Sequence, residues 1–277
     1  MAPVAFSVVV VNYFSGLLAK ACIQSIRRSN PSEPYEIFVV DNASRDDSRE
    51  VLTADIEGIR TYFSPANLGF AKAVNLALRE THGEFVLLLN PDIIVLKDAI
   101  QTLLHFMRSH PHVAIAAGQL VNPNGTVQES ALRFYTPSTI LYRRTSLGRL
   151  PWARRHLRQV FMRDRDLTKA QPVDWVIGAC MCVRRSAMKD IGPMDERFFL
   201  YFEDMDWCRR FWEHGWEVWY VPSARFAHYH KRESAQEQGL FALFHPVART
   251  HIVSGIKYFL KYRGAGAAPR RRATTEV

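Results

Sequence analysis

Short apolar runs alternate with helix-like segments over the first 120 residues of the chain. The runs rich in β-branched and aliphatic side chains are typical of strands buried on both faces; they are residues 6–11, 36–40, 59–63, 85–89 and 113–118. The segments between them carry apolar side chains three and four positions apart, which predicts helices; they are residues 15–28, 70–80 and 97–109. This alternation predicts an α/β fold with a doubly wound, mostly parallel sheet.

The periodicity fails from about residue 121 to residue 171 and then returns in a different form. Residues 173–183 form a long β-like run, residues 194–213 are acidic and aromatic, and residues 217–221 predict another strand. Residues 235–262 predict one helix, or a helix pair broken at Pro246.

These changes divide the chain into four parts. Residues 1–120 are the first half of the main domain, and residues 121–235 are its second half, with a basic insertion at 143–165. A C-terminal helical segment follows at 236–263. Residues 264–277 are compositionally biased, which predicts a disordered basic tail.

The net positive charge of the chain comes from two short stretches. The 36 Lys and Arg residues outnumber the 27 Asp and Glu residues, which gives a net charge of +9. Residues 143–165 hold eight Arg and one Asp, and residues 263–277 hold four Arg and one Glu, so the rest of the chain is nearly neutral. Arginines mixed with Leu, Trp and Phe favour an anionic membrane surface. A solvated Arg-rich loop explains them equally well. Nucleic acid is not an expected partner, because no nucleic-acid-binding motif accompanies the charge.

Several classes of protein are excluded by the composition. The longest apolar runs fall far short of the ~18 residues that a membrane-spanning helix needs. No positive charge precedes Lys20, so we do not expect a secretory signal. Four cysteines are too few for a disulfide scaffold, and we expect them to be reduced in a cytoplasmic protein, without a zinc site.

Polar residues follow three of the predicted strands. They are Asn12-Tyr13, Asp41-Asn42 and Asn90-Pro91-Asp92, and a loop at 67–69 is expected beside them. Because ligands bind beyond the carboxyl ends of parallel strands, these residues predict a binding crevice. No GxGxxG follows the first strand and no P-loop is present, which excludes ordinary dinucleotide and P-loop sites. An aspartate beside an amide suits Mg²⁺ or Mn²⁺ on diphosphate oxygens. Taken alone, a simple turn explains residues 90–92 somewhat better.

Two acidic residues and a histidine are further candidates for chemistry. Glu203 and Asp204 follow a run of aromatic residues, and a carboxylate in an apolar pocket can act as a general base. Compensation of a helix dipole explains the same pair equally well. His228 can complete a metal shell of oxygen and nitrogen ligands, whereas a lone histidine is more often a simple core or surface residue.

The order of these motifs resembles that of glycosyltransferase family 2, with the greatest similarity to its rhamnosyltransferase-like bacterial branch. The resemblance extends over about residues 5–235. The segments that carry it are VVVVNY (8–13), VVDNAS (39–44), NLGFAKAVN (67–75), LLNPD (88–92), GACM (178–181) and FFLYFED (198–204).

This resemblance implies a GT-A fold, with a Rossmann-like nucleotide-binding half and an acceptor-side half followed by terminal helices. It implies that Asp41 binds the pyrimidine base, that Asn12 and Tyr13 line the nucleoside pocket, and that Asn67 and Lys72 lie near the ribose or diphosphate.

The resemblance also implies the residues that perform the transfer. Asp92 would bind Mg²⁺ or Mn²⁺ with His228, and Asn90 stands where many members have a first aspartate. Asp204 would be the base that deprotonates the acceptor hydroxyl, with Glu203 supporting it. Two aromatic residues, Trp175 and Tyr201, are expected to face the acceptor sugar, although core packing is the competing explanation for aromatic residues here.

The implied function is an inverting, metal-dependent glycosyl transfer. The donor would be a UDP- or dTDP-sugar, with dTDP-L-rhamnose as one candidate, and the acceptor a saccharide or polyprenyl-linked saccharide of a cell-envelope polysaccharide. The enzyme would be cytoplasmic, or peripheral on the inner face of the cell membrane. Two alternatives remain open: a catalytically silent module that binds sugar or nucleotide, and a sugar nucleotidyltransferase.

Overall fold

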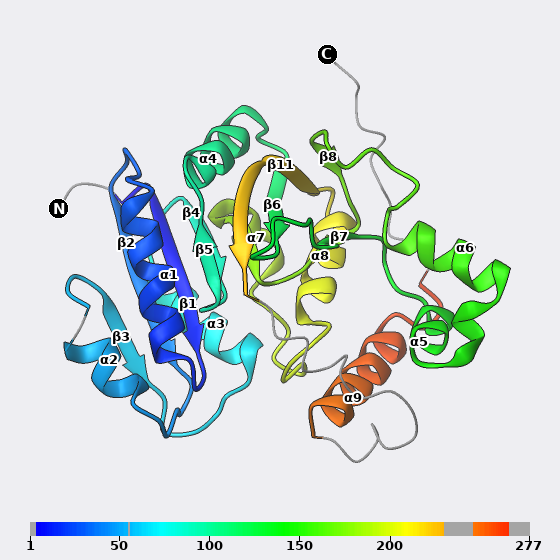
Figure 1. The fold of residues 1–277 in the computed structure, drawn as a ribbon, viewed down its shortest axis with the longest axis horizontal. Helices are drawn as coiled ribbons and strands as arrows, with labels where there is room; N and C mark the ends of the chain where they lie inside the picture. Colours follow the sequence, from blue (N-terminus) through cyan, green and yellow to red (C-terminus); the bar gives the residue numbers. More distant parts are fainter. Residues whose placement is uncertain (1–3, 55, 230–245, 266–277) are drawn as a thin grey trace.

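Helices cover both faces of a central sheet in the computed structural model, which describes residues 4–54, 56–229 and 246–265 (Figure 1). The first half of the chain supplies β1 (Phe6–Asn12), α1 (Gly16–Arg28), β2 (Tyr35–Asp41), α2 (Ser48–Ala54), β3 (Arg60–Phe63), α3 (Phe70–Glu80), β4 (Phe85–Leu89), β5 (Ile93–Val95), α4 (Ala99–Ser109) and β6 (Val113–Val121). The second half supplies β7 (Ala131–Leu132), α5 (Pro137–Arg144), the 3₁₀ helix η1 (Ser146–Arg149), α6 (Pro151–Val160), β8 (Gln171–Pro172), β9 (Trp175–Val176), β10 (Cys180–Arg184), α7 (Arg185–Ile191), α8 (Glu203–Glu213), β11 (Glu217–His228) and α9 (Pro246–Lys261).

The sheet is mostly parallel, but an antiparallel strand lies near its centre. Its strand order is β3-β2-β1-β4-β10-β6-β11-β5, and β8 pairs with β11. β1 is parallel to β2 and β4, and Asn12 pairs with Asp41 where β1 and β2 end. β10 runs antiparallel to β4, so its first residue, Cys180, pairs with Leu89, the last residue of β4. Residues that precede β10 therefore meet residues that follow β1, β2 and β4 at one edge of the sheet.

Alternate side chains of the strands fill two hydrophobic layers. Val8 of β1 belongs to the layer that includes Ile23 of α1, whereas Val9 belongs to the layer that includes Val74 of α3 and Phe211 of α8. This is the two-residue period of a strand that is buried on both faces. The predicted doubly wound α/β fold is thus confirmed, and the predicted helices of the first half are found to within two residues.

The predicted run at 173–183 is not one strand. It is divided into β9 and β10, because the backbone at residues 177–179 makes other hydrogen bonds. The N–H of Ile177 donates to the Ser130 carbonyl at 3.1 Å, and the N–H of Gly178 donates to Asp204 Oδ2 at 2.9 Å. The break therefore lies beside one of the predicted catalytic residues.

The basic insertion at 143–165 is largely helical, where the sequence predicted no regular structure. α5 begins with a capping box in which Thr136 and Thr139 bond each other's backbone, and Pro137 occupies its first turn. α6 also has a proline, Pro151, in its first turn but, unlike α5, no side-chain cap. Few apolar side chains of these short helices are buried. The capping box of α5 and the proline in the first turn of each helix are the local signals that mark their starts.

The predicted strand at 217–221 continues to His228. The pairing of β11 with β6 shifts between Val221 and Arg225, which accommodates Pro222, a residue without a backbone N–H. As a result His228 lies within a strand, paired with Ile93 of β5.

The C-terminal helix begins at Pro246, where the sequence predicted a break. Residues 230–245 and 266–277, which include most of the predicted tail, lie outside the described residues. The four cysteines are free and buried, in agreement with the prediction that they are reduced. In the part of the chain that the structure describes, no helix has the length and apolar character needed to span a membrane.

Candidate active site

Asn12 and Asp41 form a buried polar pair at the carboxyl ends of β1 and β2. The amide of Asn12 donates to Asp41 Oδ1 at 2.8 Å, and the backbone N–H of Ser44 donates to Asp41 Oδ2 at 3.2 Å. Neither Asn12 nor Asp41 is more than 3% exposed. Tyr13 follows directly and is 48% exposed, which leaves its ring available to a ligand above the pair.

The loop before α3 is fastened to this edge. Asn42 donates to Asn67 Oδ1 at 2.9 Å, and the N–H of Phe70 donates to the Phe199 carbonyl at 2.7 Å. Gly69 has a φ of 77°, and a Cβ there would stand 2.4 Å from the Phe199 carbonyl oxygen. Only glycine therefore fits the contact between this loop and the loop that precedes α8.

A buried amide makes a second connection between α3 and the loop that precedes α8. Asn75 donates to the Met194 carbonyl at 2.8 Å and accepts from the Met194 N–H at 3.0 Å. The Asn75 side chain thus satisfies both backbone groups of Met194, as a neighbouring strand would. Loss of such a partner would leave two buried backbone groups unsatisfied, at about 1–3 kcal/mol each.

Asp92 and His228 face each other at the same edge. Asp92 Oδ2 lies 3.4 Å from His228 Nε2. Gln128 orients the His228 ring. The side-chain amide nitrogen of Gln128 donates to the His228 backbone carbonyl at 2.9 Å, so the amide oxygen of Gln128 faces His228 Nδ1, at 2.8 Å. In a neutral ring Nδ1 therefore carries the proton, and the Nε2 lone pair is on the side of Asp92.

The residues fit a divalent cation in this position. Asp92 Oδ1 is buried without a hydrogen-bond partner among the described residues. A carboxylate and a neutral imidazole whose other nitrogen is fixed by an amide are a usual pair of metal ligands. Within residues 4–54, 56–229 and 246–265, no group of three or more His, Cys, Asp and Glu side chains could hold a metal without other ligands.

Residues 177–179 join this edge to Asp204. The N–H of Asn90 donates to the Ala179 carbonyl at 2.9 Å, and the N–H of Gly178 donates to Asp204 Oδ2 at 2.9 Å. The backbone N–H of Met205 donates to Asp204 Oδ1 at 2.8 Å. Both oxygens of Asp204 are thus held by backbone groups.

The environment of Asp204 suits a general base. Burial raises its pKa to about 6, against the opposing effect of the hydrogen bonds from Gly178 and Met205. A carboxyl group with this pKa is ionised at neutral pH but is a stronger base than an exposed aspartate. Asp204 is the second residue of α8, where the helix dipole also favours the anion.

Glu203 is more deeply buried than Asp204. It is 4% exposed, and its Oε2 has no hydrogen-bond partner in the described part of the chain. Burial, followed by the charge of Asp204, raises the pKa of Glu203 well above its usual value. Tyr201 and Phe202 precede it with φ values of 69°, in the left-handed region. Backbone strain of this kind costs about 1–3 kcal/mol per residue and is concentrated at functional sites.

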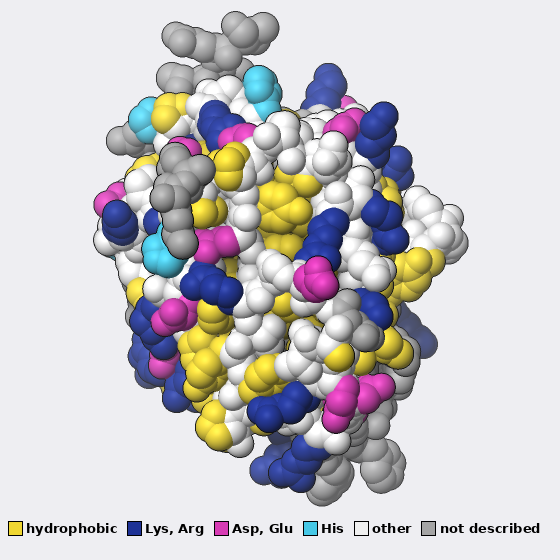
Figure 2. All heavy atoms as spheres, turned by 90° about the vertical axis from the view of Figure 1, so that its left-hand side faces the viewer, with side chains coloured by type: hydrophobic (Ala, Val, Ile, Leu, Met, Phe, Trp, Pro, Cys, Tyr) yellow, Lys and Arg dark blue, Asp and Glu magenta, His cyan; other side chains and the backbone are white. Residues whose placement is uncertain are grey.

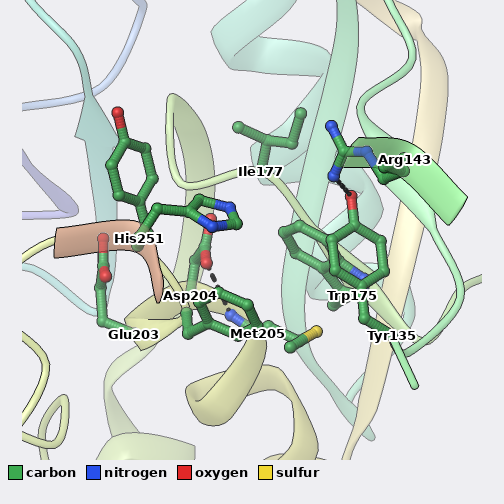
Figure 3. A pocket seen from close by; sticks show the side chains of 10 residues that line it. Tyr135, Arg143, Trp175, Ile177, Glu203, Asp204, Met205 and His251 are labelled. Atoms are coloured by element: carbon green, nitrogen blue, oxygen red, sulfur yellow. Dashed lines mark hydrogen bonds between the residues drawn. The ribbon is translucent and has the colours of Figure 1, made fainter. Parts of the chain in front are cut away.

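A cavity of about 200 Å³ lies over Asp204 (Figure 3). Its lining includes Tyr135, Arg143, Trp175, Tyr201 and His251. The rings of Tyr135 and Trp175 meet edge to face at 5.2 Å, and Trp175 donates to the Arg133 carbonyl at 3.0 Å. The ring of His251 lies 5.1 Å from that of Tyr201. The cavity therefore offers flat apolar faces beside a carboxylate, which suits a sugar ring.

A buried ionic network holds α9 against α8 below this cavity. Asp206 is fully buried, and it accepts from Lys261 at 2.6 Å, Tyr262 at 2.8 Å and Arg210 at 3.0 Å. Ser254 of α9 donates to the Leu200 carbonyl at 2.8 Å. The loop that precedes α8 is thus held by α3 on one side and by α9 on the other.

The structure brings most of the predicted site residues together. Asn12, Asp41, Asn67, Asn90 and Asp92 lie at the carboxyl edge of the sheet, and Trp175, Tyr201, Glu203 and Asp204 line the cavity. Lys72 is different: it is exposed on α3 and, among the described residues, makes no hydrogen bond or ion pair with the others.

The sequence missed several residues of the site. Gln128, Tyr135 and Arg143 lie in the segment where the sequence predicted no elements, and His251 lies in a helix with no predicted role. Each reaches the site only through tertiary contacts, so no local pattern could have identified it.

We predict that Glu203→Gln makes the protein more stable at pH 8 than the wild type, with a smaller gain at pH 4.5. Because the pKa of Glu203 is raised in the folded state, its contribution to stability is complete below pH 4.5 and declines as the pH rises. Glutamine does not titrate. Thermal unfolding at both pH values measures this, with exposed Glu57→Gln as the control. An equal or lower melting temperature of the variant at pH 8 would contradict the raised pKa of the buried Glu203 carboxyl group.

Comparison with known proteins is consistent with this geometry. The profile of the glycosyl transferase family 2 matches residues 7–192. N-acetylglucosaminyl-diphospho-decaprenol L-rhamnosyltransferase of Mycobacterium tuberculosis is 30% identical over 238 residues, which cover 82% of this chain and 76% of the relative. Rhamnosyltransferase WbbL of Escherichia coli is 23% identical over 238 residues, with 83% of this chain and 84% of the relative covered.

The fold is shared with solved glycosyltransferases. A mannosyltransferase from Pyrobaculum calidifontis in complex with GDP-Man and Mn²⁺ superposes with a TM-score of 0.62 at 17% identity, covering 97% of this chain and 67% of that chain. The ordered motifs, the sheet and these matches lead to one conclusion: the chain belongs to glycosyltransferase family 2, is related to rhamnosyltransferases, and has the GT-A fold.

Proposed function

We propose that this glycosyltransferase moves a sugar, with inversion, from a UDP- or dTDP-sugar to a saccharide linked to a lipid through a diphosphate. L-Rhamnose is the sugar we favour, because two relatives are rhamnosyltransferases. One of them is named for an N-acetylglucosaminyl-diphospho-decaprenol acceptor, which supports a lipid-linked acceptor in cell-envelope polysaccharide synthesis. The observation that carries the proposal is Asp204, a carboxylate with a raised pKa that is fixed at both oxygens in an aromatic cavity.

In this proposal Asp204 accepts the proton of the acceptor hydroxyl as that oxygen attacks the anomeric carbon. The hydrogen bonds from Gly178 and Met205 keep the carboxylate from turning, so its position is set before the acceptor binds. Direct attack opposite the leaving diphosphate inverts the anomeric centre. Glu203, whose raised pKa favours the neutral form, adds no second charge to the site.

The donor would bind at the carboxyl edge of the sheet. Asp41 and Asn12 would contact the pyrimidine, Tyr13 would cover it, and Asn67 would lie near the ribose or diphosphate. Asp92 and His228 would hold Mg²⁺ or Mn²⁺, with Asn90 beside them. When bound, the cation would neutralise the charge that develops on the leaving diphosphate. Lys72 would reach the diphosphate only if its exposed side chain reorients.

We also propose that the α5–α6 segment contacts an anionic membrane surface. Leu147, Leu150 and Trp152 are each at least 39% exposed there. Arg154, Arg155 and Arg158 are exposed on α6. Exposed apolar side chains among arginines suit a helix that lies in the lipid interface. Lys and Arg alternate with Asp and Glu over the face formed by α1 to β3, on the opposite side of the molecule (Figure 2).

The variant Asp204→Asn should lose at least 100-fold in transfer rate, because asparagine has nearly the same shape but cannot accept the proton. Its affinity for UDP or dTDP should change less than twofold, since the donor binds through other residues. A donor panel with Mg²⁺ or Mn²⁺ and calorimetry with the nucleotides measure these effects. Asp98→Asn, an exposed site at the start of α4, is the matched control. Normal turnover of Asp204→Asn would disprove the assignment.

The triple variant Arg154→Ala, Arg155→Ala and Arg158→Ala should bind anionic liposomes about 100-fold more weakly, at about 1 kcal/mol for each arginine. Flotation with vesicles of anionic and of neutral phospholipid measures this. A triple alanine variant at Arg28, Arg45 and Arg49, on the α1–β3 side, should float like the wild type. Unchanged flotation of the α6 variant would remove the basis for this membrane contact.

A further inference from the structure

Arg143, in the last turn of α5, has its guanidinium at the cavity that contains Asp204. Its Nη1 donates to the Tyr135 hydroxyl at 2.8 Å. The guanidinium carbon lies 5.3 Å from the centre of the Tyr135 ring and 5.4 Å from that of Phe161. These contacts hold the charged group in place while its other N–H groups stay available.

Arg144, the next residue, adds a second positive charge close to Tyr201 and His251, which line the cavity. It is half-buried, and burial together with the charge of Arg143 lowers its pKa. Burial lowers the pKa of His251 to about 4, with added effects from Arg144 and then Arg143. Both arginines therefore act electrostatically on His251, a residue of α9 that lines the cavity, and this histidine stays neutral at pH 7.

No carboxylate compensates these two charges in the part of the chain that the structure describes. Other arginines of the second half do have acidic partners: Arg133 pairs with Asp164, Arg163 with Glu129, and Arg209 with Glu213. Arginines in the last turn of a helix can simply compensate the helix dipole. That role does not explain why the guanidinium of Arg143 is packed on aromatic rings at the cavity. The Arg143 guanidinium is packed on aromatic rings, Arg144 is half-buried, and neither has a carboxylate partner among the described residues. Two such guanidinium groups are a typical phosphate-binding arrangement.

The position of the arginines favours the acceptor over the donor. Arg143, Tyr135 and Trp175 stand on one side of Asp204, away from Glu203 (Figure 3). α5 lies near α6 and α9, whereas β1 and β2, whose ends carry Asn12 and Asp41, are at the far side of the sheet (Figure 1). A base must contact the acceptor, so groups that share its cavity on this side are placed to bind the rest of that molecule.

We propose that Arg143 and Arg144 form a subsite for the diphosphate of the acceptor. This inference rests on the proposed function. A saccharide whose first sugar carries a diphosphate would place that anion on the two guanidinium groups and its hydroxyl at Asp204. Its lipid chain would then leave past the exposed apolar side chains of η1 and α6, at Leu147, Leu150 and Trp152.

The test is direct binding without a donor, so it does not depend on catalysis. The probes are N-acetylglucosamine linked through a diphosphate to a short alkyl chain, the neutral alkyl glycoside of the same sugar, and dTDP or UDP. Calorimetry should show that Arg144→Gln weakens binding of the diphosphate probe about 10-fold or more. Binding of the neutral glycoside and of the nucleotide should change less than twofold. Arg149→Gln, an exposed neighbour on η1, should match the wild type for all three probes.

Arg144→Lys separates charge from shape, because lysine keeps the charge but cannot bind two oxygens with a planar fork. It should recover only part of the affinity. The proposal is overturned if the wild type does not bind the diphosphate probe, or if Arg144→Gln weakens both sugar probes equally. It is also overturned if only nucleotide binding suffers, because the subsite would then belong to the donor. Wild-type binding of the probe without transfer from any donor would instead disprove the proposed function.

Discussion

The hydrogen bond from the Gly178 N–H to Asp204 is the constraint on which the arrangement of the site depends. It requires the chain to leave strand geometry between β9 and β10, and the same three residues also bond Ser130 and Asn90. Because β10 is antiparallel to β4, this break falls where β4 ends. The candidate base and the segment that ends in Asp92 are therefore positioned by one short piece of backbone. A continuous strand at 173–183 would have removed this connection.

The first turn of α8 uses its acidic residues in two ways. Asp206 is buried with three donors, from Lys261, Tyr262 and Arg210, and it fixes α9 to the domain. Removing one partner of a buried ion pair typically costs about 3–5 kcal/mol. Glu203 and Asp204 have no such cationic partner among the described residues, and burial raises the pKa of each. The ionised form of Asp206 is thus stabilised by its donors, whereas Glu203 and Asp204 are protonated more easily than an exposed carboxylate. This is the usual difference between a structural and a functional acid.

The sequence alone was sufficient to predict those parts of the fold and of the site that follow from local patterns. The strand ends at Asn12, Asp41 and Asp92 could be found because apolar runs stop there, and parallel strands bring their carboxyl ends together. The division of residues 173–183 could not be foreseen, because it depends on a carboxylate 26 residues away in the chain. α5 and α6 were missed because they are short and bury few apolar side chains, although Thr136 and Pro137 marked a helix start. Gln128, Tyr135 and His251 join the site through the fold alone.

The role of Asp204 as the base is tested most directly by the pH dependence of kcat/KM for transfer. A base must be deprotonated to act, so the rate should rise with pH and level off above a midpoint near pH 6, where Asp204 ionises. Measurement from pH 4.5 to 8.5, at constant ionic strength and saturating Mg²⁺ or Mn²⁺, would show this limb. A rate that is independent of pH over this range, or that falls as Asp204 ionises, would show that Asp204 is not the base.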